Sequence, residues 1–275
     1  ETRVAVVENG MLQELHIERG WRRGVVGNIY KGRVQRVMPG MQAAFVDIGL
    51  ERAAFLHAAD IFKPPSVGNG DADEAPLPPT PTRPIAELLR DGEEIIVQVV
   101  KDPIGSKGAR LTTQLSIPSR YLVLLPQSRV VGISARIEDE GERARLKGLV
   151  GELAAPHGGF GYIARTNAEG QPAEALAEDV AYLSRAWALV EQRAGDAAVG
   201  SCVYEDLSLP MRAVRDLMRR DVEKVRVDSR ETFDRLREFA SQYMSAMATS
   251  DDDLAGRIEH YAGARPIFDL YGIED

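Results

Sequence analysis

The sequence predicts an α+β fold made of several subdomains, one of which is a small closed β-barrel. Three observations predict it: a hairpin signature near the start, a run of short strands after it, and helical spacing of apolar residues in the last third. With 275 residues, the chain has room for one large domain or two to three small ones. Its hydrophobic fraction of 44% and charged fraction of 28% are typical of globular proteins.

The first element is a predicted β-hairpin. An apolar run at 4–7 and a run of mixed apolar and polar residues at 12–17 flank Glu8, Asn9 and Gly10. Asn-Gly favours a tight turn because both residues tolerate a positive φ angle.

Five short strands then follow within about 90 residues, which favours a small closed barrel over an open sheet. We expect them at 27–37, 43–48, 53–56, 95–100 and 110–115. Seven prolines in the segment from Phe62 to Pro84, the last of them Pro84 itself, interrupt the series. Such a segment buries too little apolar surface to offset its ordering entropy, so it predicts a mobile surface excursion. A short helical piece is expected at 85–89.

Strands and helices alternate in the next segment. We expect a buried strand at 121–125 that ends before Pro126, a charged amphipathic helix at 138–153 and a strand at 161–165. A helical apolar stripe follows, in which we interpret the tryptophan as a core residue: Leu176, Val180, Leu183, Trp187 and Val190.

The last third predicts two helices, at 210–224 and 229–247, with Asp228 as the cap of the second and Glu231 at the reciprocal position. The apolar run at 266–271 is interpreted as a strand. The clustered acids Asp251, Asp252 and Asp253 are interpreted as a solvated linker.

The charge is unevenly distributed. The formal net charge is −8, yet residues 21–46 contain no Asp or Glu. This stretch holds five cations: Arg22, Arg23, Lys31, Arg33 and Arg36. A basic island in an acidic chain favours a defined anion-binding face. The alternative is a basic face that pairs with acidic neighbours.

No apolar run is long enough to span a bilayer, so we expect no membrane association. The single cysteine, Cys202, excludes an intrachain disulfide and a multi-cysteine metal site. The start shows neither a secretory leader nor a Met. We therefore expect a cytoplasmic chain that begins inside a longer protein.

Two phenylalanines are the candidate base-stacking residues. Phe45 and Phe55 each lie in a predicted barrel strand, where a phenylalanine is more often a core residue. Lys107 lies at a glycine-flanked turn from which a cation can reach a phosphate, although it could equally be an ordinary exposed lysine. The sequences GNIYKGRV (27–34), AAFVDIG (43–49) and AFLH (54–57) resemble an S1-type RNA-binding domain. This is an OB-fold barrel that stacks bases on aromatic rings while basic side chains follow the phosphates, here Lys31 and Arg33.

A longer series of motifs resembles the ribonuclease E/G family over nearly the whole chain, with the proline-rich insert as the exception. The motifs are GVVGNIYKGRV (24–34), PGMQAAFVDIG (39–49), KGARLTT (107–113), PSRYLV (118–123), IARTNAEG (163–170), RVDSR (226–230), HY (260–261) and PIFDL (266–270).

The resemblance implies an architecture of three subdomains. An RNase H-like subdomain would comprise 1–24 and 203–275, with the S1-type barrel at 25–115 inserted into it and a small α/β 5′-sensor subdomain at 116–202. The family's sensor holds the 5′-monophosphate of an RNA end, and Arg165 and Thr166 match its main contacts. A guanidinium fork and a hydroxyl suit terminal phosphate oxygens. Val123 and Ser119 match two further sensor positions, although other members have glycine where Ser119 stands. A sensor arginine from later in the family's chain has no counterpart in this sequence.

The resemblance also implies the activity of the parent protein, a magnesium-dependent endoribonuclease that cuts AU-rich single-stranded RNA, preferably 5′-monophosphorylated, in ribosomal and messenger RNA processing. In the family, a DNase I-like subdomain holds the magnesium-binding aspartates, and a zinc link joins protomers into a homodimer or higher assembly. Both would lie beyond Asp275, so we expect no catalytic or metal-binding residue here and an inactive chain. The alternative is a stand-alone RNA-binding module with no hydrolytic role.

Overall fold

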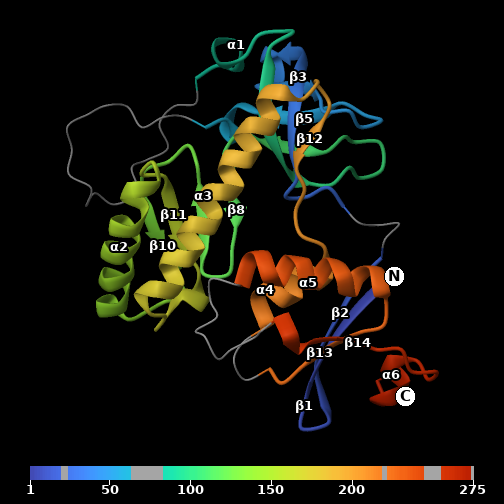
Figure 1. Cartoon of the computed structure of the whole chain (residues 1–275). Helices are drawn as coiled ribbons and strands as arrows, with labels where there is room; N and C mark the ends of the chain where they lie inside the picture. Colours follow the sequence, from blue (N-terminus) through green and yellow to red (C-terminus); the bar gives the residue numbers. More distant parts are fainter. Residues whose placement is uncertain (20–23, 63–82, 219–221, 245–254, 274–275) are drawn as a thin grey trace. The chain divides into compact units, whose positions relative to one another are not determined.

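The computed structural model describes residues 1–19, 24–62, 83–218, 222–244 and 255–273 (Figure 1). The chain divides into two compact units. One comprises Glu1–Arg23 and Leu207–Asp275, and the other comprises Gly24–Asp206. The mixture of strands and helices in both units confirms the α+β class. The proline-rich segment at 63–82, Arg22, Arg23 and the acids at 251–253 lie outside the described residues.

The first unit begins with the predicted hairpin. Strands β1 (Thr2–Glu8) and β2 (Met11–Glu18) pair in antiparallel fashion. Asn9 and Gly10 adopt φ angles of 51° and 77°, as a tight hairpin turn requires. The rest of the unit contains helices α4 (Leu209–Leu217), α5 (Arg230–Met244) and α6 (Ile267–Leu270), and the parallel strands β13 (Val225–Val227) and β14 (Ile258–His260).

Three predictions about this unit were wrong in part. The helix expected at 210–224 ends at Leu217, where Met218 turns to an extended conformation and is buried. Ser229, not Asp228, caps α5, because its Oγ accepts a hydrogen bond from the Thr232 amide at 3.2 Å.

The run at 266–271 is not a strand but contains α6, whose Leu270 amide donates to the Pro266 carbonyl at 3.1 Å. This apolar run is so short that it fits one helical turn as well as it fits a strand. The spacing of its residues therefore does not decide between the two structures.

The second unit contains the predicted barrel. Its strands are β3 (Ile29–Met38), β4 (Ala43–Asp47), β5 (Ala54–His57), β6 (Glu94–Lys101) and β7 (Arg110–Thr112). They are ordered β3-β4-β5-β7-β6, and β6 pairs back onto β3, which closes the barrel. The short helix α1 (Ile85–Leu88) places Ile85 in the same core. The core is apolar, and its fully buried members include Val34, Val46, Leu56, Val97 and Leu111.

A sixth strand joins the barrel from much later in the chain. Strand β12 (Cys202–Tyr204) pairs with the beginning of β3, with Cys202 opposite Tyr30. Nearby, the Gly200 amide donates to the Lys31 carbonyl at 2.7 Å and the Lys31 amide donates to the Ser201 carbonyl at 3.0 Å. The barrel sheet is therefore completed by residues beyond the predicted range of 25–115.

The remainder of the second unit is a small sheet with two helices. Its strands, in the order β10-β11-β9-β8, are β10 (Val131–Ile133), β11 (Gly161–Ala164), β9 (Leu122–Leu125) and β8 (Ile117–Pro118). Helices α2 (Glu140–Ala154) and α3 (Ala173–Asp196) complete it. The predicted apolar stripe of α3 is buried, and Trp187 is 9% exposed, which confirms its place in the core. No helix in the described part of the chain is long and apolar enough to cross a membrane.

Candidate nucleic-acid interface

Phe45 and Phe55 lie side by side on the outer surface of the barrel. They are direct cross-strand partners on β4 and β5, and their rings meet edge to face with centroids 6.1 Å apart. Both are half-buried, whereas the residues next to them along the strands, such as Val46 and Leu56, point into the core. The two phenylalanines are therefore not core residues. Their half-exposed rings are available to stack on a flat ligand.

Basic residues continue this aromatic pair across the barrel. Arg36 on β3 is the cross-strand partner of Phe45, and Arg110 on β7 is the partner of Phe55. Lys101 on β6 is in turn the partner of Arg110. We call these five residues the barrel row. Its rings are flanked by cations, which is the composition expected of a surface that stacks bases and attracts phosphates.

The cations of the barrel row differ in their partners. The Arg110 guanidinium donates from Nε and Nη2 to Asp60 Oδ2, at 3.0 and 2.9 Å. Arg36 and Lys101 are exposed and form no ion pair with any residue that the structure describes. These two side chains keep their charge available for an anion.

Lys31 and Arg33, which the sequence also proposed for phosphate contacts, both pair with Glu94. Lys31 Nζ lies 3.6 Å from Glu94 Oε2, and Arg33 Nη2 lies 2.8 Å from Glu94 Oε1. The Arg33 hydrogen bond is the main cause that lowers the pKa of the Glu94 carboxyl. At these two positions, the structure favours the alternative of a basic face paired with an acidic neighbour.

Lys107 is exposed in a tight turn, as predicted. Ile104 and Lys107 exchange backbone hydrogen bonds of 3.2 and 3.0 Å across Gly105 and Ser106. The next residue, Gly108, runs so close to β5 that a Cβ there would lie 1.9 Å from the Ala53 carbonyl oxygen. The Lys107 turn therefore lies beside the start of the strand that carries Phe55.

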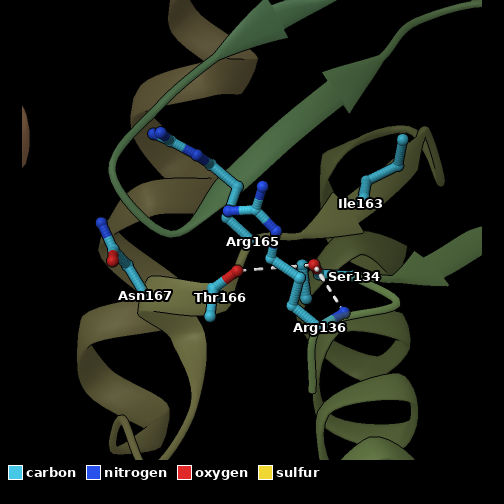
Figure 2. A pocket seen from close by; sticks show the side chains of 7 residues that line it. Ser134, Arg136, Ile163, Arg165, Thr166 and Asn167 are labelled. Carbon is cyan, nitrogen blue, oxygen red and sulfur yellow. Dashed lines mark hydrogen bonds between the residues drawn. The ribbon is translucent and has the colours of Figure 1, made fainter. Parts of the chain in front are cut away.

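A separate pocket of about 380 Å³ lies at one edge of the small sheet (Figure 2). Strands β10 and β11 are parallel, so the loops that follow them meet at the same edge. Ser134 comes directly after β10, and Arg165 directly after β11. The pocket is lined by Ser134, Arg136, Ile163, Ala164, Arg165, Thr166 and Asn167.

The lining of this pocket suits an anion. Arg136 and Arg165 supply two guanidinium groups, and Ser134 and Thr166 supply two hydroxyls whose oxygens lie 3.5 Å apart (Figure 2). No carboxylate belongs to the lining. The Arg136 side chain has no acidic partner among the residues described. Guanidinium and hydroxyl groups are the donors that bind phosphate oxygens.

The structure separates the four predicted sensor residues. Arg165 and Thr166 line the pocket, whereas Ser119 and Val123 do not. Ser119 is fully buried, and its hydroxyl donates to Asp179. Val123 lies on β9 as the cross-strand partner of Ile163, which does line the pocket.

The sequence reasoning missed several residues of both surfaces. Arg110 and Lys101 could have been found from the two-residue period of their strands, once the strand order was known. Ser134 and Arg136 follow a three-residue strand that was not predicted, so no sequence signal placed them beside Arg165.

The described residues offer no metal site. No group of three or more His, Cys, Asp or Glu side chains lies together among them. Magnesium and zinc, which the resemblance places beyond Asp275, stay predictions, and no chemical step is assigned to either ion.

Comparisons with known proteins agree with the motifs. The profile of the Ribonuclease E/G family matches residues 116–275. Ribonuclease G of Salmonella typhimurium (strain SL1344) and that of Escherichia coli (strain K12) are each 50% identical over the whole of this chain, which covers 54% of either relative. Ribonuclease E of Escherichia coli (strain K12) is 35% identical over the whole chain, which covers 24% of that relative. The chain thus spans about half the length of its ribonuclease G relatives.

Proposed function

Because the chain belongs to the ribonuclease E/G family, we propose that it binds single-stranded RNA on the barrel row and holds a 5′-monophosphate in the pocket between β10 and β11. The observation that carries this proposal is the pocket lining, with two arginines, two hydroxyls and no acid. A terminal monophosphate presents more oxygens and more charge than an internal phosphate, and a guanidinium fork reads them in a defined geometry.

The barrel row supports the RNA part of the proposal. Stacking on Phe45 and Phe55 tolerates any base, and the row's cations favour the phosphate backbone. A net charge of −8 weakens non-specific attraction to nucleic acid, so binding rests on this local surface. We further propose that the barrel is an S1-type OB-fold, that 116–202 form the 5′-sensor subdomain, and that 1–24 and 203–275 form an RNase H-like subdomain.

For the protein as a whole, we propose a magnesium-dependent endoribonuclease that acts in RNA processing in the cytoplasm, as a homodimer or larger assembly. The chain spans about half the length of its ribonuclease G relatives, so these properties are proposed for the protein and not assigned to the described residues. Hydrolysis is not assigned to them because their acidic side chains form no group that could hold a metal ion.

The test compares two forms of one unstructured RNA, with a 5′-monophosphate and with a 5′-hydroxyl, by competition for this chain. We expect a preference for the monophosphate that Arg165→Ala removes. Arg165→Lys keeps the charge but loses the fork, so it should retain only part of the preference. Arg185→Ala removes an exposed arginine of α3 that does not line the pocket, and should keep the parent's preference. Equal preference in the parent and in Arg165→Ala would refute the assignment of the pocket.

A further inference from the structure

Asp179 is a buried acidic residue that the proposed function does not use. It lies on the apolar stripe of α3, between Leu176 and Leu183, and is 6% exposed. Both of its carboxylate oxygens accept hydrogen bonds from residues 119–122: Oδ1 accepts from the Ser119 hydroxyl, and Oδ2 accepts from the amides of Tyr121 and Leu122, at 3.0 and 2.8 Å. Burial raises the pKa of this carboxyl to about 6, while these donors oppose the rise.

The segment that Asp179 holds is a tight turn. The Ser119 amide donates to the Leu122 carbonyl at 2.7 Å, which closes residues 119–122 into a turn. The amides of Tyr121 and Leu122 point to the carboxylate, so their positions are set by α3. The carbonyls of Ser119, Arg120 and Tyr121, in the same turn, accept hydrogen bonds from Arg165.

Those carbonyls hold the pocket arginine. Arg165 Nη1 donates to the Ser119 carbonyl and, at 3.4 Å, to the Arg120 carbonyl. The Arg165 backbone amide also donates to the Tyr121 carbonyl at 2.8 Å. Both the main chain and the guanidinium of Arg165 are thus fixed to the turn that Asp179 fixes to α3. Ser119 thus contacts both residues: its hydroxyl donates to Asp179 and its carbonyl accepts from Arg165.

We infer that Asp179 is a positioning residue for the 5′-phosphate pocket: it holds the turn at 119–122 so that the carbonyls of this turn orient the Arg165 guanidinium. This inference rests on the function proposed for the pocket. It extends the site to a helix residue that touches no pocket wall. The competing explanation is that Asp179 only attaches α3 to the sheet, in which case its loss would lower stability without changing how the two RNA ends are distinguished.

The test measures the preference for 5′-monophosphorylated over 5′-hydroxyl RNA in variants of the whole chain. Asp179→Ala removes all three acceptor contacts and should lower the preference by about tenfold or more, the factor for one charge-assisted hydrogen bond. Asp179→Asn can still accept from both amides and should keep most of the preference. Glu191→Ala, at an exposed acid of the same helix, is the matched control.

A double variant shows whether the effect passes through Arg165. If Asp179 acts by orienting this arginine, Asp179→Ala combined with Arg165→Ala should show the same preference as Arg165→Ala alone. Thermal unfolding of each variant reports its stability separately. If Asp179→Ala does not fold, Asp179→Leu fills the same buried space without an acceptor and takes its place in every comparison.

The outcomes separate the two proposals. A folded Asp179→Ala that keeps the parent's preference, a loss in Asp179→Asn as large as in Asp179→Ala, or a double variant that loses more than Arg165→Ala would overturn the positioning role while leaving the pocket assignment intact. A parent chain with no preference for either end would overturn both.

Discussion

Replacing Phe55 by alanine should weaken the binding of any single-stranded RNA to this chain. The ring is half-exposed on the barrel and lies between Phe45 and Arg110 in the barrel row. One base stacked on an aromatic side chain contributes about 1–3 kcal/mol. Because about 1.4 kcal/mol corresponds to a tenfold change in Kd, the expected loss is roughly 5- to 150-fold.

The geometry of the two rings adds a second expectation. Phe45 and Phe55 meet edge to face at 6.1 Å, and such a contact contributes about 0.5–1.5 kcal/mol beyond its buried area. Each single substitution therefore also removes support from the remaining ring. The double variant should lose less binding free energy than the sum of the two single variants.

Fluorescence anisotropy with a labelled oligoribonucleotide of mixed sequence measures these effects. Phe55→Tyr keeps the ring and should bind within a few-fold of the parent, whereas Phe160→Ala removes a half-buried ring outside the barrel and should leave the Kd unchanged. Parent affinity in folded Phe55→Ala, or losses that follow only the melting temperature of each variant, would show that the barrel row does not stack bases.

Two further predictions concern stability. Gly108→Ala places a Cβ 1.9 Å from the Ala53 carbonyl oxygen. It should lower the free energy of unfolding by about 3 kcal/mol, which is the upper end of the usual cost of overpacking. The control is Gly148→Ala in α2, where the added Cβ meets open space, and this substitution should be neutral or stabilising. A melting temperature of Gly108→Ala equal to that of the parent would contradict the close approach. The raised pKa of Asp179, about 6 against an ordinary 3.8, means that the folded chain binds this proton more tightly than the unfolded chain. The free energy of unfolding should therefore fall by about 3 kcal/mol as pH rises from about 3 to about 7, relative to Asp179→Asn. Urea denaturation of both chains across this range measures the difference, and parallel curves would refute it.

Much of the fold could be predicted because its strands carry strong local signals. Asn9 and Gly10 determine the first hairpin by their own backbone preferences, and the barrel strands follow the two-residue period of a half-buried sheet. The errors lie where tertiary contacts decide the outcome. The helix expected to run to 224 ends when Met218 leaves it to enter the core, and the run at 266–271 is too short for any period to choose between strand and helix.

The candidate site was less accessible to sequence reasoning. Motifs pointed to Arg165 and Thr166, and the structure brings these together in one pocket. Arg136 is their neighbour only because β10 and β11 run parallel, a pairing that no local pattern encodes. Asp179 did carry a signal: it stands on the buried stripe of its helix, three residues after Leu176, where an ionisable residue needs a partner. That partner, the turn at 119–122, lies about 60 residues earlier in the chain and cannot be read from spacing.

Because β12 comes late in the sequence, the barrel sheet cannot be completed until long after its other strands have been synthesised. Strands β3 to β7 are complete once Thr112 has been synthesised, but the beginning of β3 stays without its β12 partner until Tyr204 has left the ribosome. At about 5–20 residues per second, the roughly 90 residues between them take about 5–20 s to translate. During that interval the nascent chain presents an open strand edge, which is the feature that promotes pairing with a foreign strand. A barrel cut out at residue 115 would keep that edge open permanently.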